Sequence, residues 1–127
     1  MIRVLVLCLL LILVPPVAFA QPVSSGLNIQ RAIINVATAT TTTLVAAVAG
    51  QVINVYSWEL FCNAANSITI IDSTPTTLVP IQAYVANQGV IRSMRSAPWF
   101  STAAGKSLQM TTSAAQQCSG NVYYTQG

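Results

Sequence analysis

The stretch that decides the fold is residues 51–62, with the sequence QVINVYSWELFC. Its apolar side chains stand at even positions, namely Val52, Tyr56, Trp58 and Leu60. Alternation with a period of two, in a run rich in aromatic and β-branched residues, is typical of a strand that buries one face. The stretch therefore predicts a long β-strand at the centre of the chain.

The residues that follow predict a partner for this strand. Residues 63–66 (NAAN) have the composition of a tight turn, and residues 67–72 alternate Ile68 and Ile70 with polar neighbours. Two alternating runs separated by a short turn are typical of a β-hairpin. We therefore expect the two strands to be joined as a hairpin.

Short apolar runs separated by turn residues recur outward from this hairpin in both directions. Further strands are expected over residues 32–37, 40–48, 77–85, 90–94, 107–112 and 118–125, with a tight turn at 87–89. The threonines 40–43 favour extended backbone, although LVAAV (44–48) is also compatible with one helical turn. About eight strands without a convincing helix predict an antiparallel sandwich or barrel. We expect an all-β domain over residues 31–127, specifically a jelly-roll-like β-sandwich.

The chain begins with the features of a secretory signal peptide. A positive start (Met1-Ile2-Arg3) precedes the apolar run 4–14, and Ala18-Phe19-Ala20 supplies the small residues of a cleavage site. As a helix this run rises only about 16 Å, whereas a bilayer core needs about 30 Å. We expect a signal helix over residues 1–20, cleavage between Ala20 and Gln21, and a flexible lead-in over 21–30. The mature chain is then secreted, extracellular or periplasmic, without a membrane span; an uncleaved hydrophobic start is the alternative.

The charged residues are few enough to exclude several functions. Charged residues make up 6% of the chain, against about 25% in an ordinary domain, and histidine is absent. After residue 20 the charged residues are Arg31, Arg92, Arg95, Lys106, Glu59 and Asp72. Nucleic-acid binding requires clustered basic residues, so no nucleic-acid partner is expected. No metal site and no cofactor are expected either.

Two cysteines, Cys62 and Cys118, remain after the signal peptide. An even number of cysteines in an exported domain indicates a disulfide, and here one bridge closes a long loop. Two buried free thiols are the alternative.

Catalysis is not expected from this set of side chains. Glu59 and Asp72 are the only carboxylates available for acid and base work of the glycosidase kind, and Glu59 lies in an aromatic-rich strand where one outward charge keeps a sheet soluble. Gly105-Lys106-Ser107 resembles the end of a phosphate-binding loop. The glycine required five positions earlier is Phe100, so a hairpin turn with Gly105 at positive φ is expected instead.

Two groups of side chains are candidates for binding. Arg92 and Arg95 lie three positions apart, and two planar guanidinium groups suit sulfate, phosphate or an acidic sugar. The alternative is a pair of solvated arginines. The aromatic residues, among them Trp58, Trp99 and Phe100, suit a sugar-stacking platform, but Trp58 and Phe100 are expected in the core.

Two segments suggest a family. AIINVATATTTTLVAAVAGQVINV (32–55) and WFSTAAGKSLQMTTSAA (99–115), followed by Gly120 and Tyr124, resemble small β-rich proteins of unestablished function from tailed phages and viral metagenomes. The resemblance implies a sandwich domain of a virion or its accessory structures, such as a decoration or fibre part, and it favours a trimer. It carries over no catalytic residue.

We therefore expect a non-enzymatic structural or interaction protein of viral type. Low charge favours packing against identical copies, and the only lysine, Lys106, lies in an expected turn rather than on an edge strand. The expected partners are copies of the same chain and a virion or cell-surface component. The alternative function is a secreted recognition module that binds a glycan or another cell-surface component, which the signal peptide and the disulfide favour.

Overall fold

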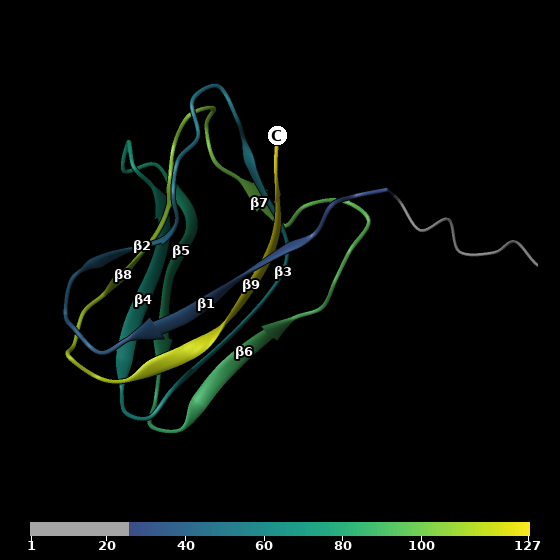
Figure 1. Ribbon diagram of the computed structural model, residues 1–127. Coiled ribbons are helices and arrows are strands. Elements are labelled where there is room, and N and C mark those ends of the chain that lie inside the picture. Colours follow the sequence, from purple (N-terminus) through teal and green to yellow (C-terminus); the bar gives the residue numbers. More distant parts are fainter. Residues whose placement is uncertain (1–25) are drawn as a thin grey trace, which may run out of the picture.

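Alternating sequence gives alternating burial most regularly in β4 (Asn66–Asp72) and β8 (Leu108–Thr112). The computed structural model describes residues 26–127 (Figure 1). These residues form nine strands and no helix: β1 (Gln30–Val36), β2 (Thr41–Val45), β3 (Ile53–Cys62), β4 (Asn66–Asp72), β5 (Thr77–Tyr84), β6 (Gln88–Arg92), β7 (Phe100–Ser101), β8 (Leu108–Thr112) and β9 (Cys118–Gln126). The expected all-β class is confirmed. The short strand β7 was not expected, and the segment after Val45 forms neither strand nor helix.

The strands form two antiparallel sheets that pack face to face. The first sheet has the order β1-β9-β3-β6, with β7 also on β3, and the second has the order β2-β8-β4-β5. The pairs β1–β9, β2–β8, β3–β6 and β4–β5 are all antiparallel, so the chain folds as one long hairpin rolled into a sandwich. This is the connectivity of a jelly roll, and it confirms the expected architecture.

The core lies between the inner faces of the two sheets. Side chains there are almost fully buried: Ile34, Ile53, Val55, Leu60, Ile68, Ile70, Leu108, Met110 and Val122. Each large aliphatic side chain contributes about 1.5–3 kcal/mol through its burial. Trp58 and Tyr124 belong to the same cluster, and the partly buried Phe100 packs against it. This agrees with the assignment of Trp58 and Phe100 to the core.

The central strand departs from strict alternation at one point. Its pairing with β9 shifts between Val55 and Ser57, so that Tyr56 forms a β-bulge. Both Val55 and Tyr56 are therefore buried, and the buried set changes from odd positions before the bulge to even positions after it. The expectation of even positions is correct from Tyr56 onward and wrong for Val52.

Two expected hairpin turns and the expected tight turn at residues 87–89 are corners between the two sheets. Residues 63–65 connect β3 to β4, which lie in different sheets, and the same holds for the turn after β5 and the turn before β8. A jelly roll requires this, because its consecutive strands mostly alternate between sheets. The expected positive φ at Gly105 is confirmed, with a value of 69°, whereas the positive φ of 59° at Asn87 was not predicted. Strands β4 and β5 form the direct hairpin, through residues 73–76.

The amino-terminal predictions are tested only in part. The signal segment 1–20 and the cleavage site between Ala20 and Gln21 lie outside the described residues. Of the lead-in, residues 26–29 have no regular structure, and Gln30 already begins β1. No helix within residues 26–127 has the length and apolar character needed to cross a membrane.

Candidate functional site

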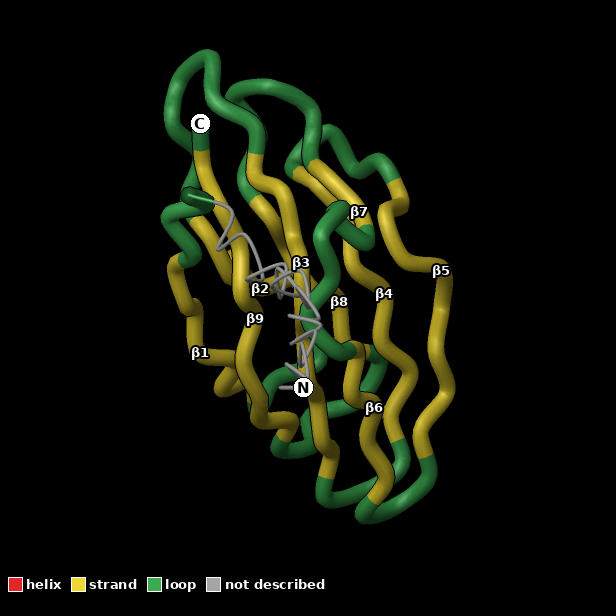
Figure 2. The backbone as a smooth tube through the Cα atoms, turned by 90° about the vertical axis from the view of Figure 1, so that its right-hand side faces the viewer, coloured by secondary structure: helices red, strands yellow, loops and turns green. Residues whose placement is uncertain are grey.

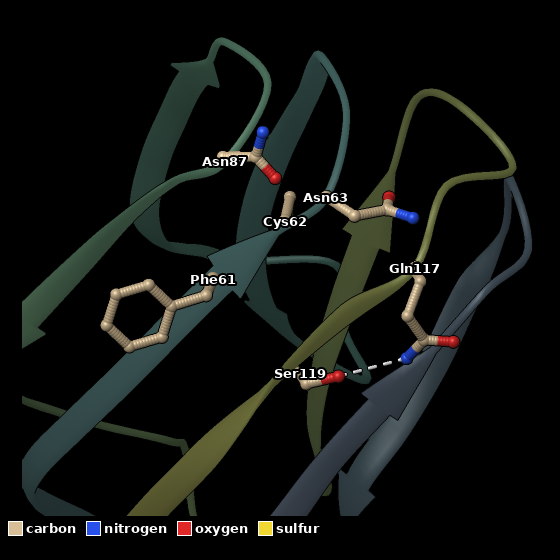
Figure 3. A pocket seen from close by; sticks show the side chains of 6 residues that line it. All are labelled: Phe61, Cys62, Asn63, Asn87, Gln117 and Ser119. Carbon is tan, nitrogen blue, oxygen red and sulfur yellow. Dashed lines mark hydrogen bonds between the residues drawn. The ribbon is translucent and has the colours of Figure 1, made fainter.

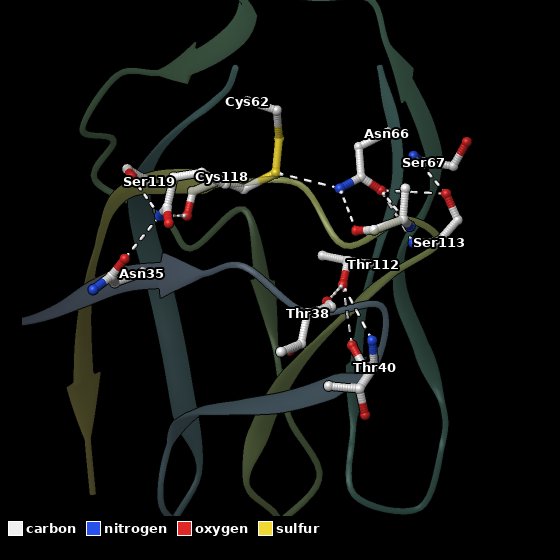
Figure 4. Close-up of a disulfide and its surroundings, with 12 residues drawn as sticks. Asn35, Thr38, Thr40, Cys62, Asn66, Ser67, Thr112, Ser113, Cys118 and Ser119 are labelled. Atoms are coloured by element: carbon white, nitrogen blue, oxygen red, sulfur yellow. Dashed lines mark hydrogen bonds between the residues drawn. A yellow bond between two sulfur atoms is a disulfide. The ribbon is translucent and has the colours of Figure 1, made fainter. Parts of the chain in front are cut away.

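A disulfide joins the two central strands of the first sheet at one end of the sandwich (Figure 4). Cys62 at the end of β3 and Cys118 at the start of β9 are directly opposite one another in the strand register. The S–S distance is 2.01 Å, and both residues are buried. The predicted bridge is confirmed, and the alternative of two free thiols is wrong.

A buried asparagine ties this corner to the second sheet. Asn66, the first residue of β4, accepts hydrogen bonds from the backbone N–H groups of Ser113 and Ala114, both at 3.1 Å. Its side-chain amide donates to the carbonyl oxygen of Ala114 and toward the sulfur of Cys118 at 3.6 Å (Figure 4). The sequence predicted only a turn residue at this position. Its structural role depends on the approach of residues 113–118, which lie almost fifty positions away.

A shallow hollow of about 330 Å³ lies beside the disulfide and carries no charged side chain. It is lined by Phe61, Cys62, Asn63, Asn87, Gln117 and Ser119 (Figure 3). The side-chain amide of Gln117 is already used, because it donates to Ser119 at 3.0 Å and to Asn35 at 2.7 Å. Phe61 packs over Gly89, where an added Cβ would lie 2.2 Å from the ring. Two of the residues that line the hollow, Gln117 and Ser119, are thus hydrogen-bonded to each other.

The two candidate arginines, Arg92 and Arg95, both contact one tryptophan, Trp99. Arg92 is the last residue of β6, and β5 and β6 are the edge strands on the same side of the sandwich (Figure 2). The guanidinium carbon of Arg95 lies 4.3 Å from the centre of the Trp99 ring, and that of Arg92 lies 5.8 Å from it. Both distances are in the range of cation–π contacts, which contribute about 0.5–1 kcal/mol at an exposed site. Both arginines therefore lie against the same ring, and their use as an anion patch stays a prediction.

The loop that carries these residues is anchored to β3. The backbone N–H of Trp99 donates to Val55 at 2.7 Å, and the backbone N–H of Arg95 donates to Tyr56 at 3.3 Å. The indole N–H of Trp99 closes the loop on the carbonyl oxygen of Ser93 at 3.0 Å. The bulge at Tyr56 separates the part of β3 that pairs with β6 from the part that pairs with β7, and the loop crosses at this point.

A hollow of about 220 Å³, which we call the Arg–Trp groove, opens beside this stack between the two edge strands. It is lined by Trp58, Leu78, Val79, Pro80, Gln82, Arg92, Trp99 and Phe100. Trp58 and Phe100 meet edge to face with ring centres 6.5 Å apart. Because Trp99 is 39% exposed and Trp58 only 4%, the sequence assignment of Trp58 to the core was correct, and Trp99 is the surface aromatic residue.

The two carboxylates do not form a catalytic pair. Glu59 lies in the first sheet, where the side-chain amide of Asn121 donates to it at 2.5 Å. Asp72 is buried at the end of β4 in the second sheet. The structure therefore assigns these residues to separate places.

Asp72 instead holds a turn together. Its carboxylate accepts from the backbone N–H groups of Thr74, Thr76 and Ala103 and from the hydroxyl of Thr74. Burial raises the pKa of Asp72, but the hydrogen bonds from Thr74, Thr76 and Ala103 outweigh burial and lower that pKa from 3.8 to about 2. The group stays ionised at any ordinary pH, so it is suited to structure rather than to proton transfer.

The Gly105-Lys106-Ser107 segment forms a turn that packs on another turn. The backbone N–H of Gly105 donates to Gln51 at 2.7 Å, and Gly50 lies beside it, also at positive φ. Strand β8 follows where a phosphate-binding loop requires a helix. Residues 26–127 contain no cluster of three or more His, Cys, Asp or Glu side chains suited to a metal ion.

Together, the fold and these sites define a disulfide-linked jelly-roll domain with a cationic aromatic groove on one side. Comparison with family models, with curated proteins and with solved structures gives no match in any of the three.

Proposed function

We propose that this protein is a non-enzymatic structural or interaction module that assembles with copies of itself through the free edge of β1. The separation of Glu59 and Asp72 onto different sheets supports the non-enzymatic part. The resemblance to small phage proteins supports a virion or accessory role, since jelly rolls are common in viral capsids. Fold alone does not define function, whereas the edge strands of the two sheets determine whether copies of the chain can pair.

Two of the four edge strands, β5 and β2, pair irregularly, and a third, β6, is short. In β5, Pro80 removes a backbone donor, and the pairing with β4 shifts twice. Strand β2 has five residues and a shift between Thr43 and Val45. Strand β6 also has five residues and leads directly into the loop 93–99. Such features block pairing with another chain, so proline and irregular pairing guard β5 although lysine is absent there.

Strand β1 is the longest edge strand that pairs without a shift, with seven residues against five in β6, and this observation carries the proposal. All seven of its residues pair with β9 without a shift, so the opposite side of the strand presents a regular row of backbone groups. Ile33 at its centre is 67% exposed. Antiparallel pairing with a second copy about a two-fold axis at Ile33 places Arg31 opposite Asn35 of that copy. No like charges then face each other across the pair.

Closure by this two-fold axis gives a dimer and leaves no β1 edge for further growth. A trimer, which the resemblance favours, requires β1 to pair with a different edge of the next copy. Light scattering on the oxidised protein tests the proposal. We expect a mass of two or three chains; a monomer whose mass does not change up to about 100 μM would overturn it.

A second candidate function is recognition of a cell-surface glycan. The observation that favours it is the pair of arginines held on Trp99 beside the Arg–Trp groove. This site lies on the β5 and β6 side of the sandwich, away from β1, so the two functions are compatible in one protein.

A further inference from the structure

We infer that the Arg–Trp groove binds a carboxylate or sulfate group carried on a single sugar ring, which makes acidic glycans the ligand class of this protein. The inference rests on the second candidate function, glycan recognition, and is independent of self-association through β1.

The charge at the groove is the first argument. Arg92 and Arg95 bring two guanidinium groups to one indole ring, and the two carboxylates of residues 26–127 are engaged elsewhere. Glu59 accepts from Asn121, and the buried Asp72 accepts from backbone N–H groups of the turn that follows it. Arg92 lines the groove itself, and Arg95 lies on the same Trp99 ring, so an anion bound in the groove is attracted by Arg92 directly and by Arg95 nearby. Guanidinium groups bind carboxylate and sulfate through paired N–H donors.

The rigidity of the site is the second argument. The carbonyl oxygen of Arg92 accepts from the Ser57 hydroxyl at 2.7 Å, and Arg95 and Trp99 are bonded to β3 through their backbone. The Trp99 ring is fixed by its own bond to Ser93. Binding therefore requires little ordering of the loop, which is a large part of the cost of recognition at most exposed sites.

The size and the walls of the groove select the ligand. A volume of about 220 Å³ is below the roughly 300–1,000 Å³ of pockets for drug-sized molecules, and it suits one ring. Val79, Pro80 and Phe100 supply an apolar surface for the C–H face of a sugar, while Gln82 supplies an amide for a hydroxyl group. A bare inorganic anion leaves this apolar surface uncovered.

Binding to three oligosaccharides of equal length tests the inference, measured by calorimetry and by Trp99 fluorescence. The probes are a hyaluronan fragment with carboxylates only, a chondroitin sulfate fragment, and a neutral chitin fragment. We expect at least one acidic probe to bind, the neutral probe not to bind, and affinity to fall between 50 and 300 mM NaCl, because exposed charges are screened. The acidic probe that binds identifies the preferred anion.

Substitution locates the binding site. We expect the double substitution Arg92→Gln with Arg95→Gln to weaken binding at least tenfold, and Lys106→Gln, which also removes positive charge, to change it less than twofold. Equal binding of the neutral probe, no binding at 10 mM, or an unchanged affinity in the double variant would overturn the inference. Competition by inorganic sulfate at the same concentration as the oligosaccharide would reduce the site to a simple anion patch, and also overturn it.

A fold control separates the two functions. The circular dichroism and the mass by light scattering of the double variant are expected to match the natural protein, since neither arginine lies at the β1 edge. A variant that loses glycan binding and keeps its mass supports the site. If the natural protein binds the acidic probes as a monomer, the self-association proposal fails and the glycan inference stands.

Discussion

Removal of the Cys62–Cys118 bridge is expected to cost about 4 kcal/mol of folding free energy. The two cysteines are 56 positions apart, and the loop-closure entropy of a cross-link of that span gives this value. Since a domain of this size is stable by about 5–15 kcal/mol in total, the loss is a large fraction of its stability. At about 4–8 °C per kcal/mol for a small domain, the melting temperature falls by roughly 15–30 °C.

Denaturant unfolding of four samples tests this value. They are the oxidised protein, the reduced protein, the single substitution Cys62→Ala and the double substitution with Cys118→Ala, the last two in reductant. If the cross-link dominates, reduction alone produces most of the loss, and the alanine variants add only about 1–2 kcal/mol of lost packing. A difference below about 1 kcal/mol between the oxidised and the reduced protein would refute the reasoning.

Two further predictions concern close packing and a buried charge. Gly120→Ala is expected to destabilise the fold by about 2 kcal/mol or more in chemical unfolding, because the new Cβ would lie 1.9 Å from the carbonyl oxygen of Glu59. The control is Gly26→Ala, whose Cβ meets nothing within 4 Å and which is expected to be neutral. Asp72 has a pKa of about 2 in the folded protein, below its ordinary 3.8. Its ionised carboxylate therefore contributes fully to the folding stability above pH 4, and this contribution disappears as the pH falls toward 2. In Asp72→Asn this acid-dependent part of the stability, followed by thermal melts between pH 2 and 5, is expected to vanish; an unchanged acid profile would contradict the assignment.

Local pattern was enough to predict the fold class. The two-residue period of residues 51–62 and 67–72 placed β3 and β4 to within two residues, and the even number of cysteines predicted the bridge. Where a strand pairs regularly with its neighbours, the alternation of apolar residues in the sequence predicts which side chains are buried. The exception at Tyr56 arises because a bulge depends on the partner strand β9, which the local pattern does not contain.

Contacts across the sheets could not be predicted from neighbouring residues. Residues 63–66 have the composition of a hairpin turn, yet the next strand enters the other sheet, because composition sets the bend of the chain and not its direction. The spacing of Arg92 and Arg95 indicated only that the two side chains could lie near each other at a strand end. Their stacking on Trp99 and the groove beside it depend on the return of the loop to β3, so the local sequence did not predict them.

The most direct test of self-association through β1 compares one substitution on two opposite edges. Ile33 on β1 and Ile81 on β5 are exposed to 67% and 69%, so Ile33→Lys and Ile81→Lys are matched in chemistry and in exposure. Lysine on an edge strand opposes pairing with another chain. Sedimentation equilibrium of the oxidised proteins is expected to give an oligomer for the natural protein and for Ile81→Lys, and a monomer for Ile33→Lys. Identical masses for the two variants would contradict the β1 edge as the assembly surface.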